Sequence, residues 1–400
     1  MAASAMSNLA DGTYQICVPL VALTITRNPT TFASVSLVAR LPWLLFSLVA
    51  GALADRLDRR RTMTLVNFGR AIAIGALATI VALDAVELWM LYVVGFALGV
   101  GETLFDTAAQ SILPNIVEAE HLDRANSRLS ATELTANQFL GPSVGALVAG
   151  AALSIALGAS AVLCMFASLA LLSVAGSFRS KREGPPTRLM TDVKEGVIYL
   201  ARHRLLRVLA VCVGVSNLAS MAVGSVLPLY LLDPGPVGLN EQWFGVLMTT
   251  FAVGAVAGTT LVEPVHARVG TRPMLLLATA AFPFFALAPA LTTSAVMIGA
   301  IFFVSGALSI AWNIITVSLR QRIVPDHLLG RVNAGYRFVA WGTLPIGAGV
   351  GGLTAAAVGL RASFAVFAAI SALCFVIVLV GTRAEAFDER VEQRVHDRAS

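Results

Sequence analysis

The stretch GALADRLDRRR, residues 51–61, places six charged side chains between two long apolar segments. Its acids are Asp55 and Asp58, and its bases are Arg56 and the run Arg59, Arg60 and Arg61. Only 13% of the 400 residues are charged and 57% are hydrophobic, whereas about a quarter of the residues of a soluble domain are charged. The stretch is therefore expected to be a short loop between two membrane-spanning helices.

Apolar windows long enough to cross a bilayer recur along the whole chain. A hydrocarbon core about 30 Å thick needs about 20 apolar residues per helix, and the period-two segments of a membrane barrel do not appear. We predict an all-α integral membrane protein with twelve transmembrane helices and no cleavable signal peptide. The expected spans are 8–26, 31–54, 62–83, 88–112, 127–152, 154–177, 206–232, 242–262, 273–291, 294–318, 332–357 and 362–382.

The basic residues predict the orientation of these spans, because cytoplasmic loops are enriched in Lys and Arg. With both termini in the cytoplasm, only Arg27 and Arg361 lie in outer loops, and Arg40, Arg70 and Arg337 lie within spans. All other Lys and Arg residues then lie in inner loops or the C-terminal tail. The pattern favours a multi-pass protein of a bacterial inner membrane, and the net charge of +5 reflects this orientation and not nucleic-acid binding.

An internal repeat divides the sequence into two related halves. IVEAEHLDRANS (116–127) returns as IVPDHLLGRVNA (323–334), so that Arg124 and Arg331 mark an offset of 207 residues. We expect six-helix bundles over 1–177 and 206–382, a cytoplasmic connector over 178–205 and a tail over 383–400. Such duplicated bundles are typical of transporters, with the substrate site between the halves. The connector also has the periodicity of an amphipathic helix lying on the membrane surface.

Cofactor chemistry is not indicated by the sequence. Both lysines lack the context of a G-x-x-x-x-G-K-[ST] phosphate loop, so the chain is not expected to hydrolyse ATP by that route or to be an enzyme. Four widely separated cysteines lack ligand spacing and are interpreted as packing residues. No metal and no cofactor is expected; the cysteines are Cys17, Cys164, Cys212 and Cys374.

The opening loop resembles the signature G-x-x-x-D-R-x-G-R-R of the major facilitator superfamily. The matching residues are Gly51, Asp55, Arg56, Arg59 and Arg60. Three further segments resemble the branch that contains the enterobactin exporter and the macrolide efflux proteins: SNLADG (7–12), SILPNIVEAEHLDRAN (111–126) and GPSVG (141–145). The resemblance implies the major facilitator fold, with two pseudo-symmetric bundles and transport by alternating access.

The resemblance also implies that the five matching loop residues form a conformational latch on the cytoplasmic side. By its position, Asp55 can pair with Arg59 or cap the following helix. Asp58 departs from the signature, which has glycine at that place. The alternative is a loop whose positive charges only set the topology.

Glycines spaced four residues apart predict helices that approach closely in lipid. These stripes are Gly141, Gly145 and Ala149, Gly254 and Gly258, and Gly347 and Gly351. Pro142 removes an intrahelical hydrogen bond, so that Gly141, Pro142 and Gly145 are candidates for helix bending, and the resemblance links such a Gly-Pro pair to antiport. Static packing is the alternative.

Carboxylates within the spans are the candidate proton carriers, because ionisable groups inside a membrane are costly and usually functional. They are Asp11, Glu102, Asp106 and Glu133. We place Asp11 first and Glu102 second, unless a cation holds Asp11 ionised. Asp106 can instead be a surface residue, and Glu133 can pair with a neighbouring helix.

Aromatic side chains on the expected cavity-lining helices suggest an amphiphilic substrate, although such residues can equally be packing. With Arg40, the candidates are Tyr14, Trp43, Phe105, Tyr230, Trp312, Tyr336 and Trp341.

We predict proton-coupled export of a small molecule such as a drug, an antibiotic or a siderophore. The alternatives are a nutrient importer or facilitator and a transport-inactive receptor. The expected partners are the substrate, protons and the lipid bilayer, without nucleic acid, and the expected state is a monomer.

Overall fold

The computed structural model describes residues 2–56, 58–112, 134–173 and 189–382, with four single residues (117, 121, 129 and 132) in addition. The first half contains α1 (Ala2–Ile25), α2 (Pro29–Arg56), α3 (Arg59–Ala82), α4 (Leu88–Ile112), the π-helix η3 (Leu134–Leu140), α6 (Gly141–Ala149) and α7 (Leu153–Leu172). The rest contains α8 (Leu189–Arg202), α9 (Arg204–Gly224), α10 (Leu227–Leu231), α11 (Glu241–Val269), α12 (Thr271–Ala280), α13 (Phe284–Leu291), α14 (Ala295–Ile323), α15 (Asp326–Val358) and α16 (Leu360–Gly381).

Within the described ranges, nine helices or helix pairs are long and apolar enough to cross a membrane. This confirms the all-α membrane class, while the count of twelve stays a prediction.

Two expected spans are interrupted. The span predicted over 206–232 ends at Gly224 and resumes as α10, and the span predicted over 273–291 is divided into α12 and α13. Pro228 and Pro283 lie at these interruptions, where a proline cannot supply the next helical hydrogen bond.

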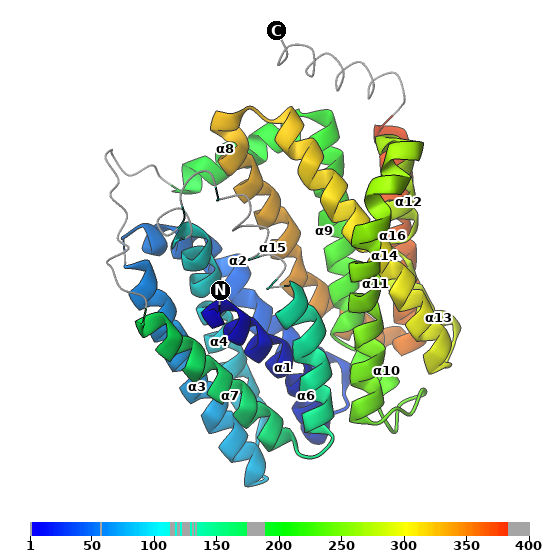
Figure 1. Cartoon of the computed structure of the whole chain (residues 1–400). Coiled ribbons are helices and arrows are strands. Elements are labelled where there is room, and N and C mark those ends of the chain that lie inside the picture. Colours follow the sequence, from blue (N-terminus) through cyan, green and yellow to red (C-terminus); the bar gives the residue numbers. More distant parts are fainter. Residues whose placement is uncertain are drawn as a thin grey trace. The chain divides into compact units, whose positions relative to one another are not determined.

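The helices group into two compact units, Met1–Pro186 with Leu227–Thr249, and Thr187–Val226 with Thr250–Ser400. In the first unit α3 packs on α4 and α7, α2 packs on α4, and α1 packs on α7, η3 and α6. Figure 1 shows α3 alongside α7 and α1 alongside α6. In the second unit α9 packs on α15 and α16, and α12 and α13 each pack on α14 and α16. The bundle boundaries expected at residues 177 and 206 stay predictions.

The glycine stripes lie at close helix contacts, as the sequence predicted. A Cβ atom added to Gly141 of α6 would lie 2.6 Å from the Gly12 Cα atom of α1, and one added to Gly145 would lie 2.9 Å from the Thr13 Cα atom. In the second unit a Cβ atom on Gly351 of α15 would lie 2.6 Å from the Ala222 Cα atom of α9. The α1–α6 and α9–α15 pairs therefore pack in the same way, consistent with the internal repeat.

Part of the connector forms a helix, α8, as its periodicity predicted. Gly196 lies directly against the Arg331 backbone of α15, where a Cβ atom would overlap the carbonyl group. Glu195 accepts a hydrogen bond from Arg331 Nη1 at 2.6 Å, and Leu200 is buried in the core of the second unit. Thus α8 is packed against the second unit, and its position on a membrane surface stays a prediction.

Candidate functional site

The loop of the opening stretch ends in a helix cap that Asp58 provides. Asp58 has extended backbone dihedrals (φ −70°, ψ 114°), and its Oδ1 atom accepts a hydrogen bond from the backbone N–H of Arg61 at 3.0 Å. This is the usual arrangement of an N-cap aspartate. The capping role that the sequence suggested for Asp55 therefore belongs to Asp58. This role accounts for an aspartate at the position where the superfamily signature has glycine. The side chains of residues 47–57 lie outside the described residues, so that the latch stays a prediction.

Replacing Asp58 with Ala is expected to lower the free energy of unfolding by about 1 kcal/mol, because α3 loses its cap acceptor. The thermal unfolding midpoint of the purified protein in detergent measures this change. Asp58→Asn is the matched control, since an amide oxygen also caps well. Equal midpoints for Asp58→Ala and the parent would contradict the capping role.

Arg60 contacts the end of another helix of the first unit. Its Nε atom donates to the Leu171 carbonyl at 3.0 Å, and its Nη2 atom donates to the Leu172 carbonyl at 2.9 Å. These carbonyls lie at the C-terminus of α7, where a cationic side chain can hydrogen-bond to the last C=O groups and interacts favourably with the helix dipole. Sequence reasoning missed this role because the two ends are far apart along the chain.

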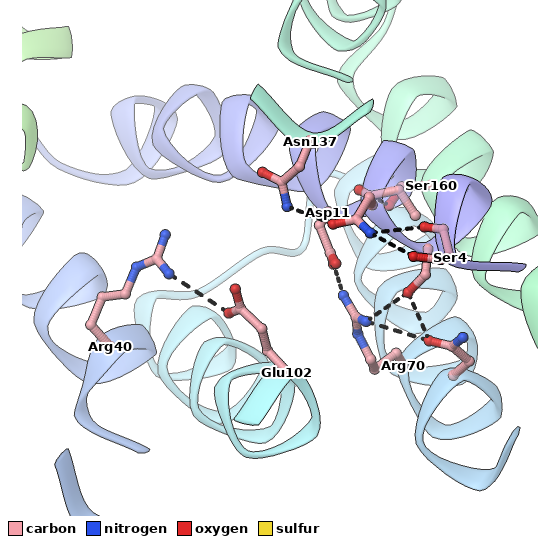
Figure 2. A network of polar contacts seen from close by, with 11 residues as sticks. Ser4, Asp11, Arg40, Arg70, Glu102, Asn137 and Ser160 are labelled. Atoms are coloured by element: carbon pink, nitrogen blue, oxygen red, sulfur yellow. Dashed lines mark hydrogen bonds and ion pairs between the residues drawn. The ribbon is translucent and has the colours of Figure 1, made fainter. Parts of the chain in front are cut away.

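A buried ion pair joins α1 to α3 in the first unit (Figure 2). Arg70 Nη2 pairs with Asp11 Oδ1, and the side chains are only 5% and 13% exposed. Arg70 Nη1 also donates to Ser7 Oγ at 3.3 Å and to Asn67 Oδ1 at 3.4 Å, and Ser7 Oγ donates to Asn67 Oδ1 at 3.2 Å. A cation therefore holds Asp11, the condition under which its candidacy as a proton carrier weakens.

A second, looser ion pair joins α2 to α4. Arg40 Nη1 lies 3.7 Å from Glu102 Oε2, and the two side chains are 27% and 24% exposed (Figure 2). The helices come close here because Gly99 of α4 faces Pro42 of α2, whose Cγ atom would lie 2.9 Å from an added Cβ atom. The buried Tyr14 hydroxyl, which lies within electrostatic range of both charges, has no hydrogen-bond partner among the described residues.

Two of the four candidate proton carriers thus lie opposite arginines. Asp106 is partly buried one helical turn beyond Glu102 on α4, where both share a helix face. Glu133 lies outside the described residues. The pairings Asp11–Arg70 and Glu102–Arg40 were not predicted, although the intramembrane arginines were a signal that such partners exist.

Most of the candidate aromatic residues are buried in this structure, and their contact with a substrate stays a prediction. Trp43, Phe105, Tyr230, Trp312 and Tyr336 are all buried. In the second unit, the Arg337 guanidinium lies 4.4 Å from the ring centre of Trp341, a cation–π distance.

The helix-bending candidates lie beside irregular backbone. The π-helix η3 runs directly into α6, which begins at Gly141 with Pro142 in its first turn. Thr13 Oγ1 of α1 donates to the Gly141 carbonyl at 3.3 Å. A π-helix is rare and often occurs at functional positions, so both packing and bending are compatible with this junction.

No group of three His, Cys, Asp or Glu side chains that could hold a metal ion occurs in the part of the chain that the structure describes. The four cysteines are buried free thiols.

Comparison with known proteins shows that this helical membrane protein is a transporter of the major facilitator type and not an enzyme. The chain belongs to the family MFS_3, described as transmembrane secretion effector, whose model matches residues 1–398. The sequence resemblance to the major facilitator superfamily is thereby confirmed.

Two curated relatives cover nearly the whole chain. The multidrug efflux pump Tap of Mycolicibacterium fortuitum is 26% identical over 380 residues, which is 90% of this chain and 90% of Tap. The uncharacterized MFS-type transporter YfiS of Bacillus subtilis (strain 168) is 27% identical over 401 residues and covers 96% of this chain and 92% of YfiS.

Two solved structures share the fold. The nucleoside transporter NupG has a TM-score of 0.72 at 13% identity, over 96% of this chain and 98% of NupG. A bacterial homologue of the iron transporter ferroportin, in an inward-facing state, has a TM-score of 0.70 at 17% identity, over 95% of this chain and 97% of that protein. At these identities the likeness concerns the fold alone.

Proposed function

We propose that this protein exports amphiphilic small molecules from the cytoplasm by alternating access and that inward proton movement drives the export. The proposal includes a bacterial inner membrane location with both termini in the cytoplasm. The observation that carries it is the partly exposed Glu102–Arg40 pair inside the first unit. The similarity to the efflux pump Tap supports the direction and the substrate class.

The two acid–arginine pairs suit different tasks. Protonating Asp11 would leave Arg70 buried without its counter-charge, which is strongly unfavourable. Glu102 keeps about a quarter of its side-chain surface exposed, and its 3.7 Å separation from Arg40 is longer than a charge-assisted hydrogen bond of about 2.7–2.9 Å. Glu102 can therefore exchange a proton at a smaller cost, and we assign it the coupling role ahead of Asp11.

In this proposal, proton movement is coupled to export because the drug and a proton compete for Glu102. In the proton-loaded step of this cycle Glu102 is protonated and not paired with Arg40. A cationic amphiphile that approaches it favours the carboxylate and displaces that proton, and reprotonation from outside later releases the drug. Each proton that moves inward supplies about 2.3 kcal/mol per 100 mV of membrane potential. That energy is sufficient to bias a cycle in which drug binding is modest.

We expect Glu102→Gln to abolish drug-induced proton release while drug binding remains. The purified full-length protein in weakly buffered detergent is mixed with ethidium, an aromatic cation, and the pH and the ethidium fluorescence are recorded together. The neutral amide cannot release a proton, but it preserves the size and polarity of the site. In cells, the same variant should accumulate ethidium to the level that an uncoupler produces with the parent.

The double variant Asp11→Asn/Arg70→Gln is the matched control, because it removes the other ion pair without leaving an unpaired charge. It should release protons as the parent does. Undiminished release by Glu102→Gln would exclude Glu102, and loss of release in the double variant would return the role to Asp11. Failure of both variants to change release would leave Asp106 and Glu133 as the remaining candidates.

A further inference from the structure

Three polar side chains line one buried face of α14 in the second unit. Trp312, Thr316 and Arg320 follow one another at intervals of four residues, which places them on the same side of the helix. Their exposed fractions are 6%, 2% and 8%. Tyr336 of α15 lies opposite, and the Arg320 guanidinium carbon is 3.6 Å from the centre of its ring. The Tyr336 hydroxyl lies next to all three α14 side chains.

This cluster contains hydrogen-bond donors without acceptors. Trp312 Nε1, Arg320 Nε and Arg320 Nη1 are buried. The Tyr336 hydroxyl approaches both side chains, but no described residue makes a well-aligned hydrogen bond with these three atoms. The Thr316 hydroxyl donates to the Trp312 carbonyl at 2.8 Å. The tryptophan and the arginine carry only donors on their side chains. Every missing partner is therefore an acceptor.

The missing acceptor also has to balance a charge. Arg40 and Arg70 each lie opposite a carboxylate, whereas Arg320 forms no ion pair with any described carboxylate. The Tyr336 ring face attracts the cation, but it cannot satisfy the in-plane N–H groups of the guanidinium. A buried cation without a counter-charge is strongly unfavourable. An anion bound in the plane of the guanidinium would supply both the missing hydrogen-bond acceptor and the missing negative charge.

We propose that Arg320, Trp312 and Tyr336 form a binding site for the oxyanion of an organic molecule, a carboxylate in particular. The planar guanidinium can hold a carboxylate with two parallel hydrogen bonds, and the indole N–H adds a third donor. The Tyr336 and Trp312 rings provide apolar surface for the organic part. A single arginine suits one negative charge better than the dianion of a phosphate monoester.

This site goes beyond the proposed export of amphiphiles and does not rest on it. Glu102 lies in the first unit and binds positive charge, whereas Arg320 lies in the second unit and binds negative charge. The carboxylate can belong to a soluble compound, and the same chemistry is offered by the phosphate of an anionic lipid. A binding measurement on the resting protein distinguishes these sources without any transport assay.

The test uses a variant that retains Trp312 as its single tryptophan, with the other four of the chain's five tryptophans replaced by Phe. Energy transfer from Trp312 reports the binding of dansylglycine, which carries a carboxylate, and of its neutral match dansylglycinamide. We expect dansylglycine to bind about tenfold more tightly, the typical effect of a charge-assisted hydrogen-bonded pair. Arg320→Gln should abolish this preference, and Arg320→Lys should reduce it, because lysine keeps the charge but not the planar fork.

Arg322→Gln is the matched control, since Arg322 lies on the same helix turn but is exposed; it should leave the preference unchanged. Displacement of dansylglycine by phosphatidylglycerol in nanodiscs, in an Arg320-dependent manner, would identify the lipid phosphate as an occupant. Displacement by soluble carboxylates alone would identify a soluble anion. Both results support the site.

Three results would overturn the proposal. The first is equal affinity of the single-tryptophan protein for the two dansyl compounds, and the second is a preference that persists in folded Arg320→Gln protein or is undiminished in folded Arg320→Lys protein. The third is carboxylate binding that occurs only after Asp326→Asn. That outcome would show that a carboxylate of the chain itself, at the start of α15, already occupies Arg320.

Discussion

Arg70→Gln is expected to destabilise the first unit by about 3–5 kcal/mol, the typical cost of removing one partner from a buried ion pair. Asp11 would keep its charge at a position where its side chain is 13% exposed, and it would lose the guanidinium that pairs with it. The thermal unfolding midpoint in detergent and the yield of monodisperse protein measure the loss.

The double variant Asp11→Asn/Arg70→Gln separates the two contributions. Because neither side chain is then charged, most of the lost stability should return, and the difference between single and double variants reports the unpaired charge. If the single variant were as stable as the double variant, the pair would not act as a buried structural contact. Asp11 would then regain its place as the first candidate for proton coupling.

Gly254→Ala is expected to have the second large effect. Gly254 of α11 meets the Phe303 carbonyl of α14, and Gly306 of α14 meets the Phe251 carbonyl of α11, so a Cβ atom at either glycine would overlap backbone. Backbone cannot move aside as a flexible side chain can, and overpacking of this kind costs about 1–3 kcal/mol or more. We expect a lower unfolding midpoint and reduced transport, because the two helices must separate.

Gly330→Ala is the matched control for this substitution. Gly330 is a helical glycine of α15 with no heavy atom within 4 Å of an added Cβ atom. Alanine there should be neutral or should raise the midpoint slightly, since alanine favours the helix over glycine. Equal midpoints for Gly254→Ala and Gly330→Ala would show that α11 and α14 do not depend on the close backbone contact.

Several features of the protein were predictable from sequence alone because their physical causes are local. Apolar windows and loop charges indicate which segments lie in lipid and which in water, and they predict the membrane class. Glycine spacing predicts the close helix contacts. The loop around Asp55 indicated the superfamily. Asp58 is an intermediate case, because its capping position was readable from an aspartate before a helix start, but the charge pattern directed attention to Asp55.

The helix interruptions depended on more than the local sequence. Hydropathy predicted one continuous span over 273–291, but the backbone there is divided into α12 and α13. Pro283 was a visible signal, yet proline within a membrane helix is often tolerated, since neighbouring groups can satisfy the freed carbonyls. Whether a proline bends or divides a helix is therefore decided by the packing around it.

By itself, the sequence determined which residues are charged inside the membrane, because burying an ionisable group is costly wherever it occurs. Only the tertiary structure decided their partners. Asp11 and Arg70, like Glu102 and Arg40, come from helices far apart along the chain, and a Coulomb interaction depends on distance in space and on local solvent exclusion. The same two quantities distinguish the enclosed Asp11 from the accessible Glu102. They also distinguish Arg320, which has no carboxylate opposite it among the described side chains, from the paired Arg40 and Arg70.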